Sequence, residues 1–251
     1  MTKITAIIPT LNEEIHIEDA IRSVSFADEI IVIDSYSSDA TVALAKKHKV
    51  NLVQRVFDDF STQKNYAIDL AKNEWIYVLD ADERVTSVLR EEILQAVKEP
   101  KQFVGFYVRR TFYFRGKKIN FSGWQRDKVV RLFSKKQCRY DGTPVHEKIK
   151  AIGKLGSFKG RIDHYSYRDF DHYISKLNHY SVLKARQLYA QEKKVNAYHL
   201  LIKPPARFII HYVIRLGFLD GFAGFVIAKT QAYAVLSRYI KLWLMNQKES
   251  F

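Results

Sequence analysis

The sequence has few of the residues that build disulfide frameworks or membrane spans. It holds one cysteine, Cys138, among 251 residues, so no disulfide can form within the chain and a reducing compartment is expected. No run of 18 apolar residues is free of charge, since the nearest candidate, residues 208–228, contains His211, Arg215 and Asp220. The first twelve residues lack a signal-peptide cleavage site and predict a β-strand instead.

Acidic residues are scarce in the second part of the chain. Residues 1–100 contain 11 basic and 18 acidic side chains, a net charge of −7, whereas residues 101–251 contain 30 and 9, a net charge of +21. The change predicts a boundary of roles near Pro100 and anionic partners for the second part, such as a pyrophosphate or a phospholipid leaflet. The chain has no nucleic-acid-binding signature, so no nucleic acid is expected. The alternative is that the charge serves solubility alone.

Apolar patterns in the first hundred residues alternate between strands and helices. Continuous apolar runs predict strands over residues 5–8, 29–33, 50–53 and 75–79. Helical spacing predicts helices over residues 15–24, 41–48, 61–71 and 86–97. Repeated β–α units require a parallel sheet with right-handed crossovers, so the fold class is α/β.

The pattern changes after Pro100. Alternating and aromatic-rich segments predict strands over residues 105–114, 119–121 and 129–134. A long amphipathic helix is predicted over residues 169–194, and the Pro204-Pro205 pair is expected to break the chain. Residues 206–245 then predict two further apolar helices that carry scattered lysines and arginines.

Polar clusters follow the predicted strands, in residues 10–14, 34–39 and 80–83. Parallel sheets bind ligands at the carboxyl ends of their strands, so the three clusters are expected to meet at one edge. Asp80 and Asp82 are carboxylates that can share Mg²⁺ or Mn²⁺, which would bridge a diphosphate. The alternatives are an acidic turn that caps the next helix and an aspartyl phosphatase motif. The phosphatase motif is disfavoured because Arg84 stands where that motif has Thr or Val.

Four blocks taken together resemble the family 2 glycosyltransferases of the GT-A fold. They are Ile-Ile-Pro-Thr-Leu-Asn-Glu-Glu from Ile7, Val-Ile-Asp-Ser-Tyr-Ser-Ser-Asp from Val32, Gln-Lys-Asn from Gln63, and Leu-Asp-Ala-Asp-Glu from Leu79. The segment Gly-Trp-Gln-Arg-Asp from Gly123 and the later Val-His-Glu from Val145 resemble the branch with lipopolysaccharide core β-glucosyltransferases. The resemblance implies a mostly parallel sheet flanked by helices, with a helical C-terminal segment.

The resemblance also implies roles for single residues on the donor side. A nucleotide-sugar donor, with a UDP-hexose favoured, would be bordered by Pro9, Thr10, Leu11, Asn12, Glu13, Asp34 and Ser35. Lys64 would face the diphosphate, Asp82 would ligate the metal, and Asp80 would hold the ribose or a metal-bound water. The second block has Asp34-Ser35-Tyr36-Ser37 where the family often has Asp-Asp-Gly-Ser, which leaves the identity of the base open.

An inverting transferase needs a carboxylate that accepts the proton of the acceptor hydroxyl. Asp127 and Glu147 are both candidates, with a slight preference for Asp127. By resemblance His146 is a further candidate metal ligand, with a hydrogen-bonded loop histidine as the alternative. Trp124, Arg126 and Arg131 are expected near the acceptor, although core packing is the alternative for Trp124.

The basic, aromatic C-terminal part fits an interfacial position on an anionic leaflet, and a helical cap on the sheet is the alternative. The expected organisation is a GT-A domain over residues 1–165, with a nucleotide-binding part (1–100) and an acceptor part (101–165), followed by a membrane-associated segment (166–251). The expected function is transfer of a hexose, glucose by preference, from a UDP-sugar to a lipid-linked saccharide such as lipopolysaccharide core. This would take place in the cytoplasm, on the inner face of the cytoplasmic membrane. A non-catalytic binder of nucleotide sugar or membrane and a metal-dependent nucleotidyltransferase or phosphatase are the alternatives.

Overall fold

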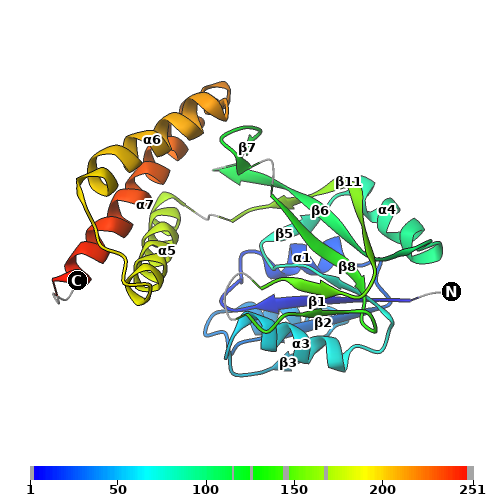
Figure 1. The fold of residues 1–251 in the computed structure, drawn as a ribbon. Helices are drawn as coiled ribbons and strands as arrows, with labels where there is room; N and C mark the ends of the chain where they lie inside the picture. The colour runs from blue at the N-terminus through cyan, green and yellow to red at the C-terminus, as the bar shows by residue number, and fades with distance from the viewer. Residues whose placement is uncertain (1–2, 115, 125–126, 144–146, 167–168, 248–251) are drawn as a thin grey trace. The chain divides into compact units, whose positions relative to one another are not determined.

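The computed structural model describes residues 3–114, 116–124, 127–143, 147–166 and 169–247. The chain forms two compact units. We call residues Met1–Arg110 and Asp127–His164 the sheet unit, and residues Thr111–Arg126 and Tyr165–Phe251 the helical unit. Each is described by itself (Figure 1).

The first half of the sheet unit is the parallel β–α array that the sequence predicts. Strands β1 (Ile4–Thr10), β2 (Glu29–Asp34), β3 (Asn51–Gln54) and β4 (Trp75–Val78) lie in the order β3-β2-β1-β4 and are mutually parallel. The helices between them are α1 (Ile17–Ser23), α2 (Thr41–Ala45) and α3 (Phe60–Leu70). The Asp59 side chain caps α3 by accepting a hydrogen bond from the Thr62 amide.

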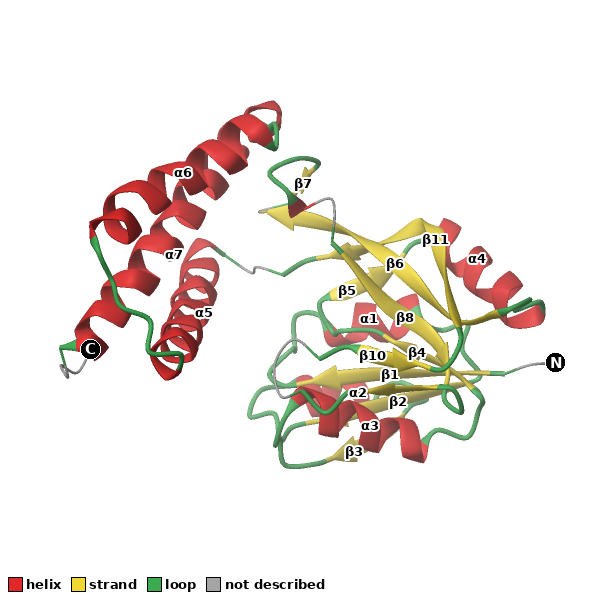
Figure 2. Ribbon diagram, in the orientation of Figure 1, coloured by secondary structure: helices red, strands yellow, loops and turns green. Residues whose placement is uncertain are grey.

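The second half adds antiparallel strands, so the complete sheet is mixed. Beyond β4 the order continues with β8 (Lys128–Ser134), β6 (Phe103–Phe114), β11 (Lys154–His164) and β5 (Glu83–Val85), and β7 (Lys117–Ile119) pairs with β6. A separate two-stranded sheet holds β9 (Cys138–Tyr140) and β10 (Ile149–Ala151). Figure 2 shows this array of strands.

Strand β11 has no counterpart among the predicted elements because glycines interrupt its apolar alternation. Its buried positions are Gly156, Phe158, Gly160 and Ile162. A Cβ atom at Gly156 would lie 2.7 Å from the Phe106 ring, and one at Gly160 would lie 2.7 Å from the backbone of Leu89. Both glycines therefore allow a close approach that no other residue permits.

Helices cover both faces of the sheet unit. One core joins α1, α2 and α4 (Ser87–Lys98) to β1, β4, β6 and β11. The other joins α3 and β9 to the opposite face of β1, β2 and β4. Central strands that are buried on both faces explain the continuous apolar runs in the sequence.

The helical unit consists mainly of three long helical segments. The chain runs from α5 (Phe170–Ala190) through η2 (Tyr198–Ile202), α6 (Lys203–Ile209) and η3 (Ile210–Ile214) to η4 (Gly217–Asp220) and α7 (Phe222–Asn246). Helix α7 packs against α5 and against α6. Among the described helices none combines the length and apolarity that crossing a bilayer requires.

The proline pair does not break the chain, contrary to the sequence-based expectation. Pro204 and Pro205 lie in the first turn of α6, the position at which helices tolerate proline best. The π-helical turn η2 precedes them, so one nearly continuous helical segment spans residues 198–214.

Candidate functional site

The loops that follow β1 and β2 are hydrogen-bonded to one another. Asn12 adopts a left-handed backbone conformation with φ of 55°, which asparagine tolerates better than most residues. Its amide donates to Ser37 Oγ (2.8 Å), and its Oδ1 accepts from the Ser38 amide (2.8 Å). The Glu13 amide donates to Thr41 Oγ1 (2.8 Å). The sheet edge therefore presents the two loops as one surface.

Asp34 is buried beneath these loops, at the end of β2. Its carboxylate accepts hydrogen bonds from the Ser37 amide and from Gln54 Nε2, both at 3.0 Å, and also from the Ser37 hydroxyl. Ser35 is fixed as well, because its hydroxyl accepts from Gln63 Nε2 (2.6 Å). Pro9 and Thr10 are the last residues of β1, and the Leu11 side chain after them is exposed. Asp34 thus holds the shape of the loop.

An acidic turn follows β4, at the same carboxyl edge of the parallel strands. Arg131 of β8 forms ion pairs with both Asp80 and Glu83, and its Nη2 lies 2.6 Å from Glu83 Oε1. Arg131 is 2% exposed and Glu83 is fully buried, whereas the Asp80 side chain is 32% exposed. The buried guanidinium of Arg131 therefore pairs with Asp80, while part of the Asp80 carboxylate remains accessible to solvent.

The network continues to two further carboxylates. Lys64 of α3 is buried, and its Nζ lies 2.6 Å from Glu147 Oε1 and 3.7 Å from Asp80 Oδ1. Arg110 of β6 lies with its Nε 2.8 Å from Glu83 Oε1 and its Nη1 3.0 Å from Asp127 Oδ2. These residues form a chain of alternating charge: Glu147, Lys64, Asp80, Arg131, Glu83, Arg110 and Asp127.

The charges of this network reinforce one another. Burial alone would raise the pKa of Asp80, but the positive charges of Arg131, Lys64 and Arg110 outweigh it and hold that pKa well below its usual range. Burial alone would lower the pKa of Lys64, but Asp80 and the other anionic neighbours raise it. Asp80 and Lys64 are therefore both ionised at neutral pH.

Asp82, two residues after Asp80, faces a histidine. Because β5 pairs antiparallel with β11 with Glu83 opposite His164, the end of β11 comes beside Asp82. Asp82 Oδ2 and His164 Nε2 are 3.2 Å apart, and both side chains are largely buried. A carboxylate oxygen and an imidazole nitrogen are donors that Mn²⁺ accepts. No group of three or more His, Cys, Asp or Glu side chains that could hold a metal ion gathers within the described residues.

The structure answers differently for the remaining predicted site residues. Trp124 belongs to the helical unit, where its ring packs against Phe112 (5.3 Å between centroids) and Tyr173 (6.4 Å). Arg131, expected near the acceptor, is instead buried under Asp80. His146 and Arg126 lie outside the described residues.

Sequence reasoning missed Glu83, Arg110 and His164. Glu83 directly follows the acidic pair in the chain, but nothing in its spacing distinguishes a buried carboxylate from a solvated one. Arg110 and His164 reach the site only through the antiparallel strands β6 and β11. An alternation that counts Gly156 and Gly160 as inward-facing positions would have predicted the strand β11, but not the register that brings its terminal His164 beside Asp82.

Comparisons with known proteins identify the family of the chain. The sequence-family model of glycosyl transferase family 2 matches residues 5–158 of this chain. The chain is 31% identical over 242 residues to the lipopolysaccharide core biosynthesis glycosyltransferase LpsC of Rhizobium meliloti, which covers 93% of this chain and 90% of that protein. It is 30% identical over 260 residues to an uncharacterized glycosyltransferase of Rickettsia typhi, covering 99% and 89%.

Among solved structures, glucosyl-3-phosphoglycerate synthase from Mycobacterium tuberculosis, in complex with Mn²⁺, UDP and phosphoglyceric acid, is 22% identical. It covers 46% of this chain and 44% of that one, with a TM-score of 0.39. The predicted GT-A fold class, with helices flanking the sheet and a helical C-terminal segment, is confirmed by the family match together with the observed architecture. The sheet edge with Asp80 and Asp82 thus lies within the matched residues, and the chain belongs to glycosyl transferase family 2.

Proposed function

We propose that the protein is an inverting hexosyltransferase that moves a sugar, glucose by preference, from a UDP-sugar to a lipid-linked saccharide such as lipopolysaccharide core. The observation that carries the proposal is the pairing of Asp82 with His164 beside the network of Lys64, Asp80 and Arg131. This edge combines a potential cation site with an ionised lysine, which suits a diphosphate leaving group.

The donor would bind along the two joined loops. Backbone and side chains of residues 9–13, together with Ser35, would border the nucleoside, and Asp34 would act by fixing the loop that it supports. Lys64 and Asp80 lie at the diphosphate end, where Asp80 would orient the ribose or a bound water. Asp82 and His164 would hold Mg²⁺ or Mn²⁺, which when bound neutralises charge on the leaving diphosphate.

The acceptor hydroxyl attacks the anomeric carbon as the bond to the diphosphate breaks, and a carboxylate takes its proton. We assign this role to Asp127, whose side chain is 41% exposed and is held by Arg110. Glu147 is 15% exposed and is bonded to Lys64, so its carboxylate is less open to an acceptor. No general acid is needed, because UDP leaves as a stabilised anion.

The helical unit fits the lipid-linked acceptor and an anionic membrane surface. It contains 17 basic and 5 acidic residues, a net charge of +12 out of the chain's +14. Within residues 200–228 the exposed side chains are all apolar, and they include Leu201, Ile209, Ile214, Leu219 and Phe222. An exposed apolar face on a strongly cationic unit suits the interface of an anionic bilayer.

The test is a screen of nucleotide sugars with a lipopolysaccharide core acceptor, in which the released nucleotide and the new linkage are identified. Intact UDP and a product with an inverted anomeric centre support the proposal. Release of a nucleoside monophosphate or of inorganic phosphate would instead indicate a nucleotidyltransferase or a phosphatase. A protein that binds donors but never turns them over would be a binding protein.

Two matched variants assign the base. Asp127→Asn is expected to lower kcat by about 10²- to 10⁴-fold, the usual contribution of general base catalysis. Glu147→Gln is expected to change kcat less and to raise the KM for the donor through Lys64. The reverse ranking of the two variants in kcat would transfer the role to Glu147.

A further inference from the structure

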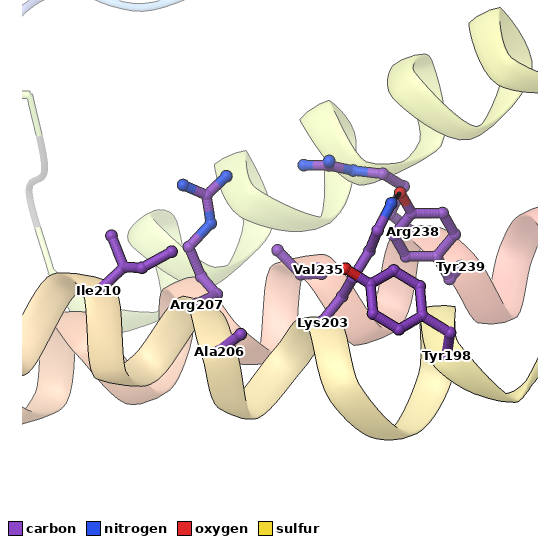
Figure 3. A pocket seen from close by; sticks show the side chains of 8 residues that line it. All are labelled: Tyr198, Lys203, Ala206, Arg207, Ile210, Val235, Arg238 and Tyr239. Carbon is purple, nitrogen blue, oxygen red and sulfur yellow. Dashed lines mark hydrogen bonds between the residues drawn. The ribbon is translucent and has the colours of Figure 1, made fainter.

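A cationic pocket lies within the helical unit, far along the chain from the acidic turn. It has a volume of about 290 Å³ and is formed by η2, α6, η3 and α7. Its charged side chains are Lys203, Arg207 and Arg238, and Tyr198 and Tyr239 complete its polar lining. In Figure 3 the side chains of Arg207, Lys203 and Arg238 extend to the same side of the two helices.

No carboxylate compensates these three cations among the described residues. Lys203 Nζ donates to the Tyr239 hydroxyl (2.6 Å) and lies 4.7 Å from the centre of that ring. Arg207 Nη1 lies 3.4 Å from His211 Nε2, a neutral partner. Arg238 Nε is buried and has no hydrogen-bond partner within the described part of the chain. The pocket therefore contains N–H donors that the described part of the protein does not fully satisfy with hydrogen-bond acceptors.

The cluster is costly to the protein as it stands. Burial lowers the pKa of Arg207, and the neighbouring charges of Arg238 and Arg215 lower it further. Burial also lowers the pKa of Arg238. Half-buried cations that have no counter-charge within the described residues are unfavourable unless an anion joins them.

The chemistry of the lining selects the anion. Two planar guanidiniums and one ammonium suit phosphate oxygens, which guanidinium groups bind in pairs. A tyrosine hydroxyl adds a further donor. A volume of about 290 Å³ admits a phosphate together with the first atoms of the molecule that carries it.

The surface around the pocket indicates what carries the phosphate. Leu201, Ile202, Pro205 and Ile209 interleave along the same helical segment with Lys203 and Arg207, and all four are exposed. The segment thus presents apolar side chains to solvent and cationic side chains to the pocket. A lipid would satisfy both, because its phosphate could enter the pocket while its acyl chains cover the apolar residues.

We propose that Lys203, Arg207 and Arg238 form a binding site for the phosphate group of a membrane lipid or glycolipid. The site deepens the proposed function, on whose membrane-facing part it rests, by naming the group through which the helical unit holds the lipid. It would anchor the chain at the surface where a lipid-linked acceptor lies.

The test is isothermal titration calorimetry at about 0.15 M salt, where diffuse surface attraction is screened. The probes are dihexanoyl phosphatidic acid below its micelle concentration, dihexanoyl phosphatidylcholine and inorganic phosphate. The proteins are the wild type, the variant R207Q/R238Q and the control R186Q/K194Q. The control removes the same charge from exposed residues that lie outside the pocket.

We expect phosphatidic acid to bind the wild type and the control at least about tenfold more tightly than R207Q/R238Q, since two charge-assisted contacts are lost. It should also bind at least about tenfold more tightly than the other two probes. Equal loss in both double variants, or equal binding of the two lipids, would overturn the site. Inorganic phosphate that binds as tightly as the lipid would overturn the lipid as its source.

Two further measurements keep the outcome interpretable. The variant R207Q/R238Q should melt no lower than the wild type, because it relieves repulsion between half-buried cations. If it melts lower, Arg238→Lys, which keeps the charge, should show an intermediate loss of lipid binding. An Arg238→Lys variant that binds like the wild type would refute the guanidinium contact. The calorimetry uses no sugar donor, so failure of the transfer reaction and failure of the phosphate site are observed separately.

Discussion

Arg131→Met is the substitution that most directly probes the charge network under Asp80. The variant keeps a long apolar side chain but removes the buried cation that lies between Asp80 and Glu83. Glu83 is fully buried, so it would be left with Arg110 as its ion-pair partner among the described residues. Loss of one partner of a buried ion pair costs about 3–5 kcal/mol, because the remaining charge stays desolvated.

The structure places the expected cost at the lower end of that range. Arg110 remains 2.8 Å from Glu83, and Asp80 is partly exposed and keeps Lys64 at 3.7 Å. We therefore expect a loss of about 3 kcal/mol. For a protein of this size that corresponds to a fall in Tm of roughly 6–12 °C. The assay is urea denaturation together with differential scanning calorimetry.

A control and a rescue make this prediction specific. Arg139→Met removes an arginine whose ion pair with Asp69 is exposed, so it should cost less than about 1 kcal/mol. In the Arg131→Met background, Glu83→Gln should recover part of the stability, because it discharges the stranded carboxylate. The reasoning is refuted if Arg131→Met lowers Tm no more than Arg139→Met, or if Glu83→Gln destabilises both backgrounds equally.

Three further predictions concern other parts of the fold. Burial and the charges of Arg215 and Arg207 lower the pKa of His211 to about 4 from 6.5. In this pH range His211 is therefore protonated in the unfolded chain but not in the folded one, and the unfolding free energy should fall by about 3 kcal/mol from pH 6.5 to pH 4. If the unfolding free energy of the wild type varies with pH as steeply as that of His211→Gln and no more, the prediction is contradicted. Gly160→Ala should cost about 1–3 kcal/mol in urea denaturation, because its Cβ would lie 2.7 Å from the Leu89 backbone, and an unchanged midpoint would argue against that close contact. Burial raises the pKa of Cys138 to about 11, so iodoacetamide at pH 8 should label the native thiol at least about 100-fold more slowly than the denatured one; equal rates would show that the thiol is accessible.

The parallel half of the fold was predictable because its strands are buried on both faces. Residues 29–33 and 75–79 form continuous apolar runs, and β2 and β4 lie there. Strand β11 was missed because Gly156 and Gly160 occupy inward positions where the pattern would need apolar side chains. The expectation that Pro204 and Pro205 break the helical segment was wrong because the effect of proline depends on its position within a helix, and both residues lie in the first turn of α6.

The site was predictable where its residues follow parallel strands and was not where antiparallel pairing brings them in. Asp80 and Asp82 come directly after β4, so the sheet-edge rule located them. His164 and Arg110 depend on the registers of β11 with β5 and of β6 with β8, which no local pattern encodes. The burial of Arg131 was hidden for the same reason, because its neighbours Asp80 and Glu83 lie about fifty positions earlier in the chain.

We propose that Asp82 and His164 together hold a divalent cation at the diphosphate of the donor. Mn²⁺ binding in the presence of UDP is measured from the electron paramagnetic resonance signal of the free ion. The proteins are the wild type, Asp82→Ala, His164→Ala and His179→Ala. The last variant is the control, because it removes an exposed histidine of the helical unit. We predict that Asp82→Ala and His164→Ala each weaken Mn²⁺ binding by at least about tenfold, while His179→Ala leaves it unchanged. A His164→Ala variant that binds Mn²⁺ as tightly as the wild type would contradict it.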